Sequence, residues 1–120
     1  MGPIKQTEQF ALKQVIQDVE DYLNSYLKLQ LDEAKRLNPD YAELWKVIIE
    51  VNSAGGKRIR PYMTVLAYKA FGGANYQSIL PIASAMELLH CAMLIHDDII
   101  DRDYVRRGKP NVAGQYYKKY

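Results

Sequence analysis

Residues 79–101 read ILPIASAMELLHCAMLIHDDIID, an apolar helical run that ends in three carboxylates within five residues. Asp97 and Asp101 are four residues apart, so in a helix they share one face and can converge on one hard cation. Asp98 lies roughly 100° around the same helix. Carboxylates this close repel one another unless a cation lies between them. The pattern therefore predicts a Mg²⁺ site that keeps open positions for an anionic substrate.

A stripe that contains most of the polar residues runs along this otherwise apolar helix. At 100° per residue its members fall within a band about 80° wide: Glu87, His90, Leu94, Asp97 and Asp101. A helix that is apolar on its other faces is expected to be buried and to line a pocket. A lone histidine is more often a hydrogen-bonded core residue than a ligand, but its place on the stripe favours an anion-binding role for His90. We interpret Glu87 as a hydrogen-bonding anchor rather than a catalyst.

Two basic segments flank the carboxylates along the chain. The first is GGKRIRP at residues 55–61, whose cations Lys57, Arg58 and Arg60 are expected to project from a helix N-terminus, where backbone N–H groups also favour anions. The second is RRGKP at residues 106–110, whose paired guanidiniums suit bidentate contact with phosphate oxygens. Together they predict two anion pockets, and hence two phosphorylated substrates, one of them metal-bound.

Each motif alone has a simpler explanation. A DDxxD run is most often a solvated helix end, a KRxR run is most often a solvated surface, and RRGKP by itself indicates a basic turn. The order and spacing of all three in one chain are much harder to obtain by chance, which favours the functional interpretation.

The segment from Gly55 to Pro110 resembles the first half of the trans-prenyltransferases, the polyprenyl and isoprenyl diphosphate synthases. The resemblance rests on GGKRIRP, on ELLH ahead of DDIID, and on RRGKP. It implies an isoprenoid-synthase fold, Mg²⁺ as cofactor, and the condensation of an allylic diphosphate with isopentenyl diphosphate.

Carried over to this chain, the resemblance implies a role for each charged residue of the motifs. Asp97 and Asp101 would bind Mg²⁺, and Asp98 would support them in catalysis. Arg106 would contact the allylic diphosphate. The basic pocket for isopentenyl diphosphate would contain Lys57, Arg60, His90 and Arg107. Arg58 is also predicted to bind substrate.

The composition is that of an ordinary soluble chain. Its 120 residues are 48% hydrophobic and 25% charged, and the net charge of +2 argues against a nucleic-acid partner. Cys91 is the single cysteine, which excludes an internal disulfide and favours a reducing, cytoplasmic location. The N-terminus lacks a signal-peptide pattern, and residues 79–95 are expected to be too short and too polar to span a membrane.

Apolar residues recur at intervals of three and four along most of the chain and predict an all-α fold. The expected helices run from about Thr7 to Leu37, from Pro39 to about Asn52, from Pro61 to Phe71 and from about Tyr76 to Asp101. Asn38-Pro39 and Gly72-Gly73 provide the stops between them. We expect an antiparallel bundle, the first helices of an isoprenoid-synthase fold, with residues 1–120 as an incomplete N-terminal fragment of a single domain.

The family that the chain resembles is well over twice this length and has a second aspartate-rich motif, which is not found between Asp103 and Tyr120. We therefore expect little or no synthase activity from this piece alone, and self-association as a homodimer or larger assembly through uncovered apolar faces. One alternative is a non-catalytic subunit that binds a larger partner chain. Another is an unrelated helical bundle whose carboxylates hold a structural cation or a di-metal centre, although such centres need more than one Glu-x-x-His pair.

Overall fold

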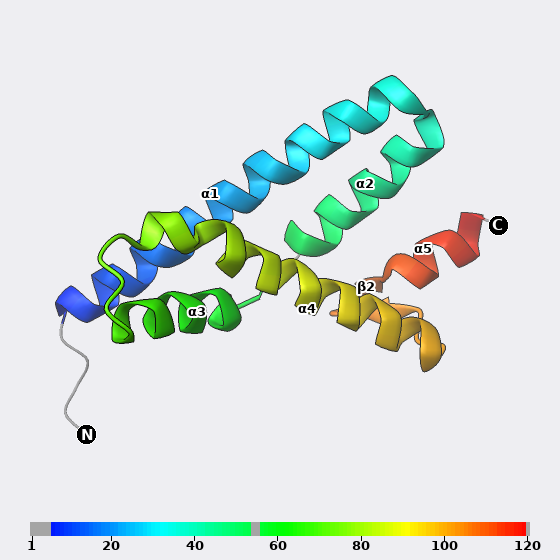
Figure 1. Ribbon diagram of the computed structural model, residues 1–120. Coiled ribbons are helices and arrows are strands. Elements are labelled where there is room, and N and C mark those ends of the chain that lie inside the picture. The colour runs from blue at the N-terminus through cyan, green and yellow to red at the C-terminus, as the bar shows by residue number, and fades with distance from the viewer. Residues whose placement is uncertain (1–5, 54–55, 120) are drawn as a thin grey trace. The chain divides into compact units, whose positions relative to one another are not determined.

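A computed structural model describes residues 6–53 and 56–119, and these residues are almost entirely helical (Figure 1). The elements in chain order are α1 (Gln6–Leu37), α2 (Pro39–Ser53), α3 (Ile59–Ala70), the 3₁₀ helix η1 (Tyr76–Ile79), α4 (Leu80–Ile100), β1 (Val105–Arg106), β2 (Lys109–Pro110) and α5 (Val112–Lys119). The predicted all-α class is confirmed, and each of the four predicted helices is present with its ends close to those expected.

The predicted stops between helices cap the helix ends, one through a side chain and one through the backbone. Asn38 Oδ1 accepts a hydrogen bond from the Asp40 backbone N–H at 2.7 Å, which caps α2 where α1 ends. At the end of α3, Gly72 has a φ of +94°, and the Gly73 N–H donates to the Tyr68 carbonyl at 2.9 Å. This is a Schellman motif, which needs the left-handed backbone that glycine adopts without strain.

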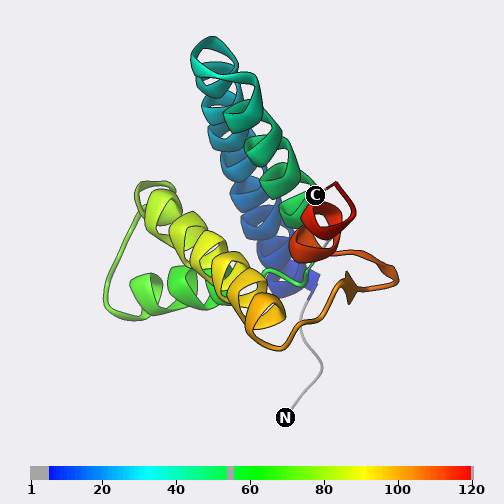
Figure 2. The ribbon, with the colours of Figure 1, turned by 90° about the vertical axis from the view of Figure 1, so that its right-hand side faces the viewer.

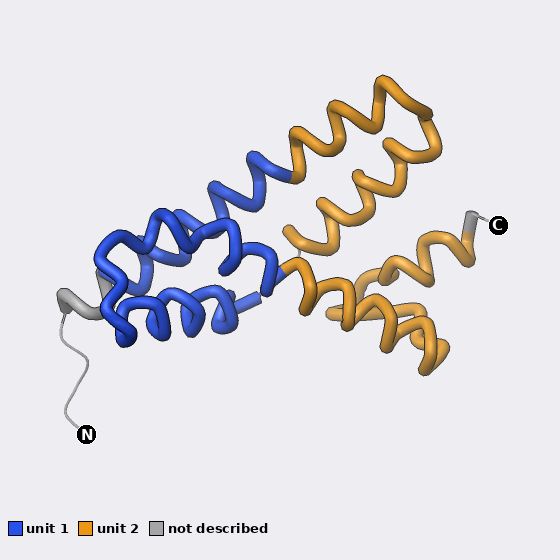
Figure 3. Tube along the Cα trace, in the orientation of Figure 1, with its two compact units in different colours: residues 1–26, 56–87 blue, residues 27–55, 88–120 orange. Residues whose placement is uncertain are grey.

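The chain divides into two compact units, residues 1–26 with 56–87 and residues 27–55 with 88–120 (Figure 3). The long helices α1 and α4 contribute to both. In the first unit, α1, α3 and the start of α4 bury a small apolar core: Val15, Val19, Leu23, Val65, Leu80 and Ala83. The four-residue spacing of the α1 positions turns one face of that helix inward.

The second unit is built around the end of α1. Helix α2 runs back beside it (Figures 1 and 2), and α5 contacts both α2 and β2. The buried apolar side chains of this unit are Leu27, Ala34, Ala42 and Val47. Two of these four side chains are alanines, so the apolar core of this unit is small.

Helix α4 is more exposed than its composition predicts. Its large apolar side chains that reach solvent are Ile82, Met86, Leu89, Met93, Ile99 and Ile100. The prediction of a buried helix is therefore wrong for this chain, because no element among the described residues covers these side chains. Their exposure agrees with the expectation of uncovered apolar faces.

Among the described residues, Tyr76–Ile100 is one helical segment long and apolar enough to cross a membrane by length and composition. The segment has 25 residues, more than the stretch 79–95 considered above, and an 18-residue window within it has a mean hydropathy of 1.7. Such a segment is a weak sign of a membrane span, since core helices of soluble proteins pass the same test. Two of its carboxylates, Glu87 and Asp98, form ion pairs with other parts of the chain.

Candidate functional site

The basic segment before α3 presents its three cations in different ways. Arg58 has a left-handed backbone (φ 52°, ψ 36°) at the N-cap of α3, and the residue is only 5% exposed. Its Nε donates to Glu20 of α1, and its Nη1 donates to Glu87 Oε1 of α4 at 2.8 Å. The projection expected for Arg58 is therefore not observed, because two carboxylates draw its guanidinium inward.

The two carboxylates offset the cost of burying the positive charge of Arg58. Burial disfavours the cation, but the hydrogen bonds and negative charges of Glu20 and Glu87 outweigh this effect, and the pKa of Arg58 is raised. Glu87 is itself buried, at 7% exposure. The interpretation of Glu87 as a hydrogen-bonding anchor is confirmed, and its partner is now identified as Arg58.

Lys57 and Arg60 lie on either side of Arg58 in the chain, and both side chains are exposed. Arg60 belongs to the first turn of α3, and Lys57 comes just before that helix. Backbone N–H groups and the helix dipole at this end add to the attraction that the two cations exert on an anion.

The three aspartates at the end of α4 fall into two environments. Asp98 is 5% exposed, and Arg106 of β1 donates to it twice, from Nε to Oδ2 at 3.0 Å and from Nη2 to Oδ1 at 2.7 Å. Hydrogen bonding from Arg106 lowers the pKa of Asp98 against the opposing effect of burial, and the same bonds raise the pKa of Arg106. Asp97 and Asp101 are exposed. The different surroundings of Asp98 match its offset of roughly 100° around the helix.

The loop after α4 is fixed by a helix cap and by Asn111. The Asp103 N–H donates to the Asp98 carbonyl at 2.9 Å while Arg102 has a φ of 56°, so α4 ends in a Schellman motif whose left-handed residue is an arginine. Asn111 Nδ2 donates to the Asp103 carbonyl at 2.7 Å, and Asn111 Oδ1 accepts from the Gly114 N–H at 2.7 Å, which caps α5. Asn111 thus links the loop after the aspartates to α5.

Sequence reasoning missed the hairpin, α5 and the role of Asn111. Strands β1 and β2 pair antiparallel, with Val105 opposite Pro110. The two residues between them, Arg107 and Gly108, have φ values of 54° and 76°, as a type I′ turn requires. A glycine in the second position of a two-residue loop and an asparagine just before a helix are signals that could have predicted both features.

The carboxylates of Asp97 and Asp101 fit a Mg²⁺ site that a substrate completes. Mg²⁺ is usually bound by one or two carboxylates together with waters and substrate phosphates. Throughout residues 6–53 and 56–119, no group of three or more His, Cys, Asp or Glu side chains is placed to hold a metal ion. Two exposed carboxylates four residues apart on one helix therefore suit this cation only if diphosphate oxygens supply further ligands.

The predicted site residues are divided between the two compact units. The first unit contains Lys57, Arg58 and Arg60, and the second contains His90, Asp97, Asp98, Asp101, Arg106 and Arg107. His90 is half-buried in α4. Within the second unit the structure brings together one predicted pair, Asp98 and Arg106.

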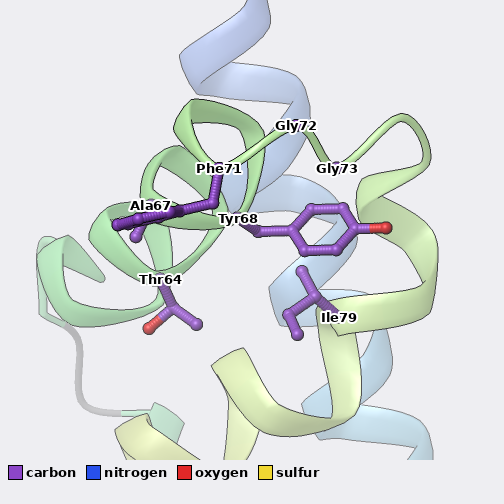
Figure 4. Close-up of a pocket in the computed structure, with 7 residues that line it drawn as sticks. All are labelled: Thr64, Ala67, Tyr68, Phe71, Gly72, Gly73 and Ile79. Carbon is purple, nitrogen blue, oxygen red and sulfur yellow. The ribbon is translucent and has the colours of Figure 1, made fainter.

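An open pocket of the first unit lies between the end of α3 and η1 (Figure 4). The residues that line it are Thr64, Ala67, Tyr68, Phe71, Gly72, Gly73 and Ile79. None of these carries a charge, and none is a predicted site residue. The pocket therefore does not suit a diphosphate, which needs cationic or N–H donors.

Comparison with known proteins places these motifs in a family. The family model of the polyprenyl synthetases matches residues 42–119. Geranylgeranyl diphosphate synthase of Methanosarcina mazei is 53% identical over 70 residues, which cover 58% of this chain and 21% of that protein. Short chain isoprenyl diphosphate synthase of Methanocaldococcus jannaschii is 54% identical over 63 residues, 52% of this chain and 19% of that protein. Heptaprenyl diphosphate synthase component 2 of Geobacillus stearothermophilus is 34% identical over 100 residues, 82% of this chain and 31% of that protein.

No solved structure gives a significant match to the chain. In these alignments the chain spans between about a fifth and a third of the length of its relatives. The family match extends over more than half of the chain and includes the basic segment before α3, the aspartates of α4 and the hairpin. It confirms the resemblance that the motifs indicate, and the chain belongs to the polyprenyl synthetase family.

Proposed function

We propose that the chain is the diphosphate-binding N-terminal part of a prenyl diphosphate synthase, which condenses an allylic diphosphate with isopentenyl diphosphate. The observation that carries the proposal is the contrast at the end of α4, where Asp97 and Asp101 are exposed while Asp98 is held by Arg106. Relatives named as geranylgeranyl, short chain isoprenyl and heptaprenyl diphosphate synthases support the same class of reaction.

In the proposed reaction the chain binds and orients two diphosphates. Asp97 and Asp101 would hold Mg²⁺, which would supply positive charge to offset the negative charge of the departing diphosphate as the allylic C–O bond breaks. The double bond of isopentenyl diphosphate attacks the resulting allylic cation, and loss of one proton gives a chain longer by one five-carbon unit. No serine, cysteine or histidine nucleophile takes part.

Arg106 can hold Asp98 and still contact a diphosphate. A guanidinium has five N–H donors, and Asp98 engages Nε and Nη2, which leaves the Nη1 donors for a ligand. The Arg106 side chain is 38% exposed. In our proposal Arg106 binds the allylic diphosphate, while Lys57, Arg60, His90 and Arg107 bind isopentenyl diphosphate.

Calorimetric titration of geranyl diphosphate into the 120-residue chain, with and without Mg²⁺, tests the proposal. We expect Mg²⁺-dependent binding that Asp97→Asn and Asp101→Asn each weaken by roughly tenfold or more, because each removes one carboxylate ligand. Asp103→Asn is the matched control, since it removes an exposed carboxylate outside the predicted stripe and should bind as the wild type does. Affinity that does not depend on Mg²⁺ or on Asp97 and Asp101 would overturn the proposal.

A second candidate function is that of a non-catalytic subunit that binds a larger partner chain. The observation that favours it is the similarity to proteins named heptaprenyl diphosphate synthase component 2, from Geobacillus stearothermophilus and from Bacillus subtilis, the latter 35% identical over 97 residues. Affinity purification of the tagged protein from its own cells separates the two functions. A stoichiometric second chain that carries another DDxxD motif would support the subunit function.

The proposal includes a cytoplasmic location and self-association. Cys91 is the single cysteine of the chain, which excludes an internal disulfide and supports a reducing compartment. The exposed apolar side chains of α4 support self-association. Cell fractionation tests the location: recovery in the soluble fraction is expected, and detergent-dependent recovery from membranes would instead indicate that Tyr76–Ile100 spans a bilayer.

A further inference from the structure

Arg58 is the best-anchored cation of the basic segment, in a position where an arginine is unexpected. Its side chain is 4% exposed, and the two carboxylates that it binds come from different helices, Glu20 from α1 and Glu87 from α4. Its backbone is left-handed, a conformation that residues with a Cβ adopt only under strain. A buried charge and a strained backbone at one residue persist only where the surroundings fix both.

The ion-pair cluster of Arg58 with Glu20 and Glu87 leaves Arg58 little capacity to bind a further anion. Its Nε and Nη1 donate to Glu20 and Glu87, and Nη2 lies 3.5 Å from the second oxygen of Glu20. The two carboxylates carry more negative charge than one guanidinium can neutralise, so the cluster itself does not attract a diphosphate. Lys57 and Arg60, the cations on either side of it in the chain, are both exposed.

We propose that Arg58 is a positioning residue that clamps the segment 56–60 to α1 and α4, and thereby presents Lys57 and Arg60 to a diphosphate that Arg58 itself does not touch. This inference rests on the proposed function, in which Lys57 and Arg60 bind the diphosphate. It changes the role that the sequence predicts for Arg58, from substrate contact to support of the two cations beside it.

If Arg58 contacts the diphosphate, Glu87→Gln should raise diphosphate affinity, because it releases a competing carboxylate. If Arg58 only positions its neighbours, the same substitution should lower it, because it loosens the segment even though a negative charge has been removed. Asp21→Asn is the matched control, because it removes an exposed carboxylate of α1 that bonds to Gln17 and not to Arg58.

The test combines two measurements on the 120-residue chain. Calorimetry with inorganic diphosphate gives the affinity, and amide hydrogen exchange of residues 62–64, where the Tyr62 N–H donates to the Arg58 carbonyl, reports the clamp without any ligand. For Glu87→Gln and Arg58→Gln we expect affinity weaker on the order of tenfold, together with faster exchange. Arg58→Lys should not restore slow exchange, because a single ammonium cannot bridge both carboxylates as the guanidinium does. Asp21→Asn should leave both readouts unchanged.

The outcomes separate failure of this inference from failure of the proposed function. Tighter diphosphate binding by Glu87→Gln, or exchange of residues 62–64 that stays at the wild-type rate in Arg58→Gln, would overturn the clamp. Lys57→Ala should weaken diphosphate binding and leave the exchange of this segment slow. If Lys57→Ala and Arg60→Ala both bind as the wild type does, the proposed diphosphate site fails, and the exchange rates alone decide whether Arg58 clamps the segment.

Discussion

Three neighbouring aspartates of the same chemistry have different roles because one of them is buried. Asp98 receives two hydrogen bonds from Arg106 and is nearly covered, whereas Asp97 and Asp101 remain exposed. A carboxylate that is already engaged by a guanidinium in this way is poorly placed to bind a metal ion, but it can fix the helix end from which its neighbours project. We therefore assign Asp98 to support and the other two to metal binding in our proposal.

Asp98→Asn is expected to destabilise the chain, while Asp97→Asn is not. The first substitution removes a charge-assisted hydrogen-bond pair from a buried site and should lower the free energy of unfolding by about 1–3 kcal/mol. The second removes an exposed carboxylate and should change it by less than about 0.5 kcal/mol. Urea unfolding followed by circular dichroism measures both. Equal losses in the two variants would contradict the division of roles.

Tyr76→Phe is expected to lower stability in a pH-dependent way. The Tyr76 hydroxyl donates to Asp18 of α1, and this hydrogen bond lowers the pKa of Asp18 more than burial raises it. A carboxyl group whose pKa is lowered on folding stabilises the folded state above its unfolded pKa of about 3.9, and this stabilisation is lost as the pH falls through the folded pKa. The free energy of unfolding of the variant should therefore be about 1 kcal/mol lower than that of the wild type near neutral pH. The difference should become progressively smaller below about pH 4.

Urea unfolding of the wild type and Tyr76→Phe across this pH range measures the difference. Tyr22→Phe is the control, because it removes the hydroxyl of a tyrosine of α1 that is 38% exposed. A difference between wild type and Tyr76→Phe that stays constant down to about pH 3 would show that Asp18 is not the titrating partner.

At the scale of elements, sequence periodicity predicted the four long helices but not the hairpin or α5. The long helices have apolar spacing over many residues, and Asn38-Pro39 and Gly72-Gly73 mark their ends. Each strand of the hairpin has two residues, which is too short for alternation to show. The pairing of Arg58 with Glu20 could not be predicted from local sequence patterns either, because the two residues are 38 positions apart and only the packing of the helices brings them together.

Arg107→Asn is expected to stabilise the hairpin while weakening diphosphate binding. Arg107 has a φ of 54° in the turn between β1 and β2, and asparagine adopts this conformation with less strain than arginine. The gain should be at most about 1 kcal/mol in the free energy of unfolding. Lys109→Asn is the control, since Lys109 is not among the residues with positive φ. A gain in stability without loss of affinity would remove Arg107 from the proposed site.

Gly114→Ala in α5 is expected to lower the free energy of unfolding, the opposite of what this substitution usually does in a helix. In an exposed helix interior, alanine is more stable than glycine by about 1 kcal/mol. A Cβ at Gly114, however, would lie 2.1 Å from the Tyr104 carbonyl oxygen, so α5 would have to shift away from the loop after α4. We expect a loss of about 1–3 kcal/mol, whereas Gln115→Ala should be nearly neutral. A more stable Gly114→Ala chain in urea unfolding would show that this close approach does not exist.

At the scale of the whole molecule, we expect the exposed side of α4 to determine whether the isolated chain self-associates. Ile82, Met86, Leu89 and Met93 recur at intervals of three and four and are all at least 40% exposed. Such a stripe is typical of a helix that packs against further protein. The chain spans between about a fifth and a third of the three relatives named above. In our proposal, further protein covers this side of α4.

The double variant Met86→Lys and Met93→Lys is expected to shift the 120-residue chain toward the monomer. Two charges on the stripe would have to be desolvated in any assembly that buries it. Light scattering coupled to size-exclusion chromatography measures the mass of each species. Leu37→Lys, at a side chain that is 72% exposed at the end of α1, is the control and should leave the distribution unchanged. An unchanged mass for the double variant would show that α4 is not the contact.

The purified 120-residue chain is expected to form no prenyl product from geranyl diphosphate, isopentenyl diphosphate and Mg²⁺. An allylic cation survives only where protein excludes water, and here the apolar side chains next to the aspartates, such as Met93 and Ile100, are themselves exposed to water. Co-expression with the part of the Methanosarcina mazei relative that this chain does not match should restore elongation, measured as radiolabelled product, and Asp97→Asn should abolish it again. Robust Mg²⁺-dependent elongation by the chain alone would contradict this expectation. It would mean that self-association of the chain already provides the enclosure that the described residues lack.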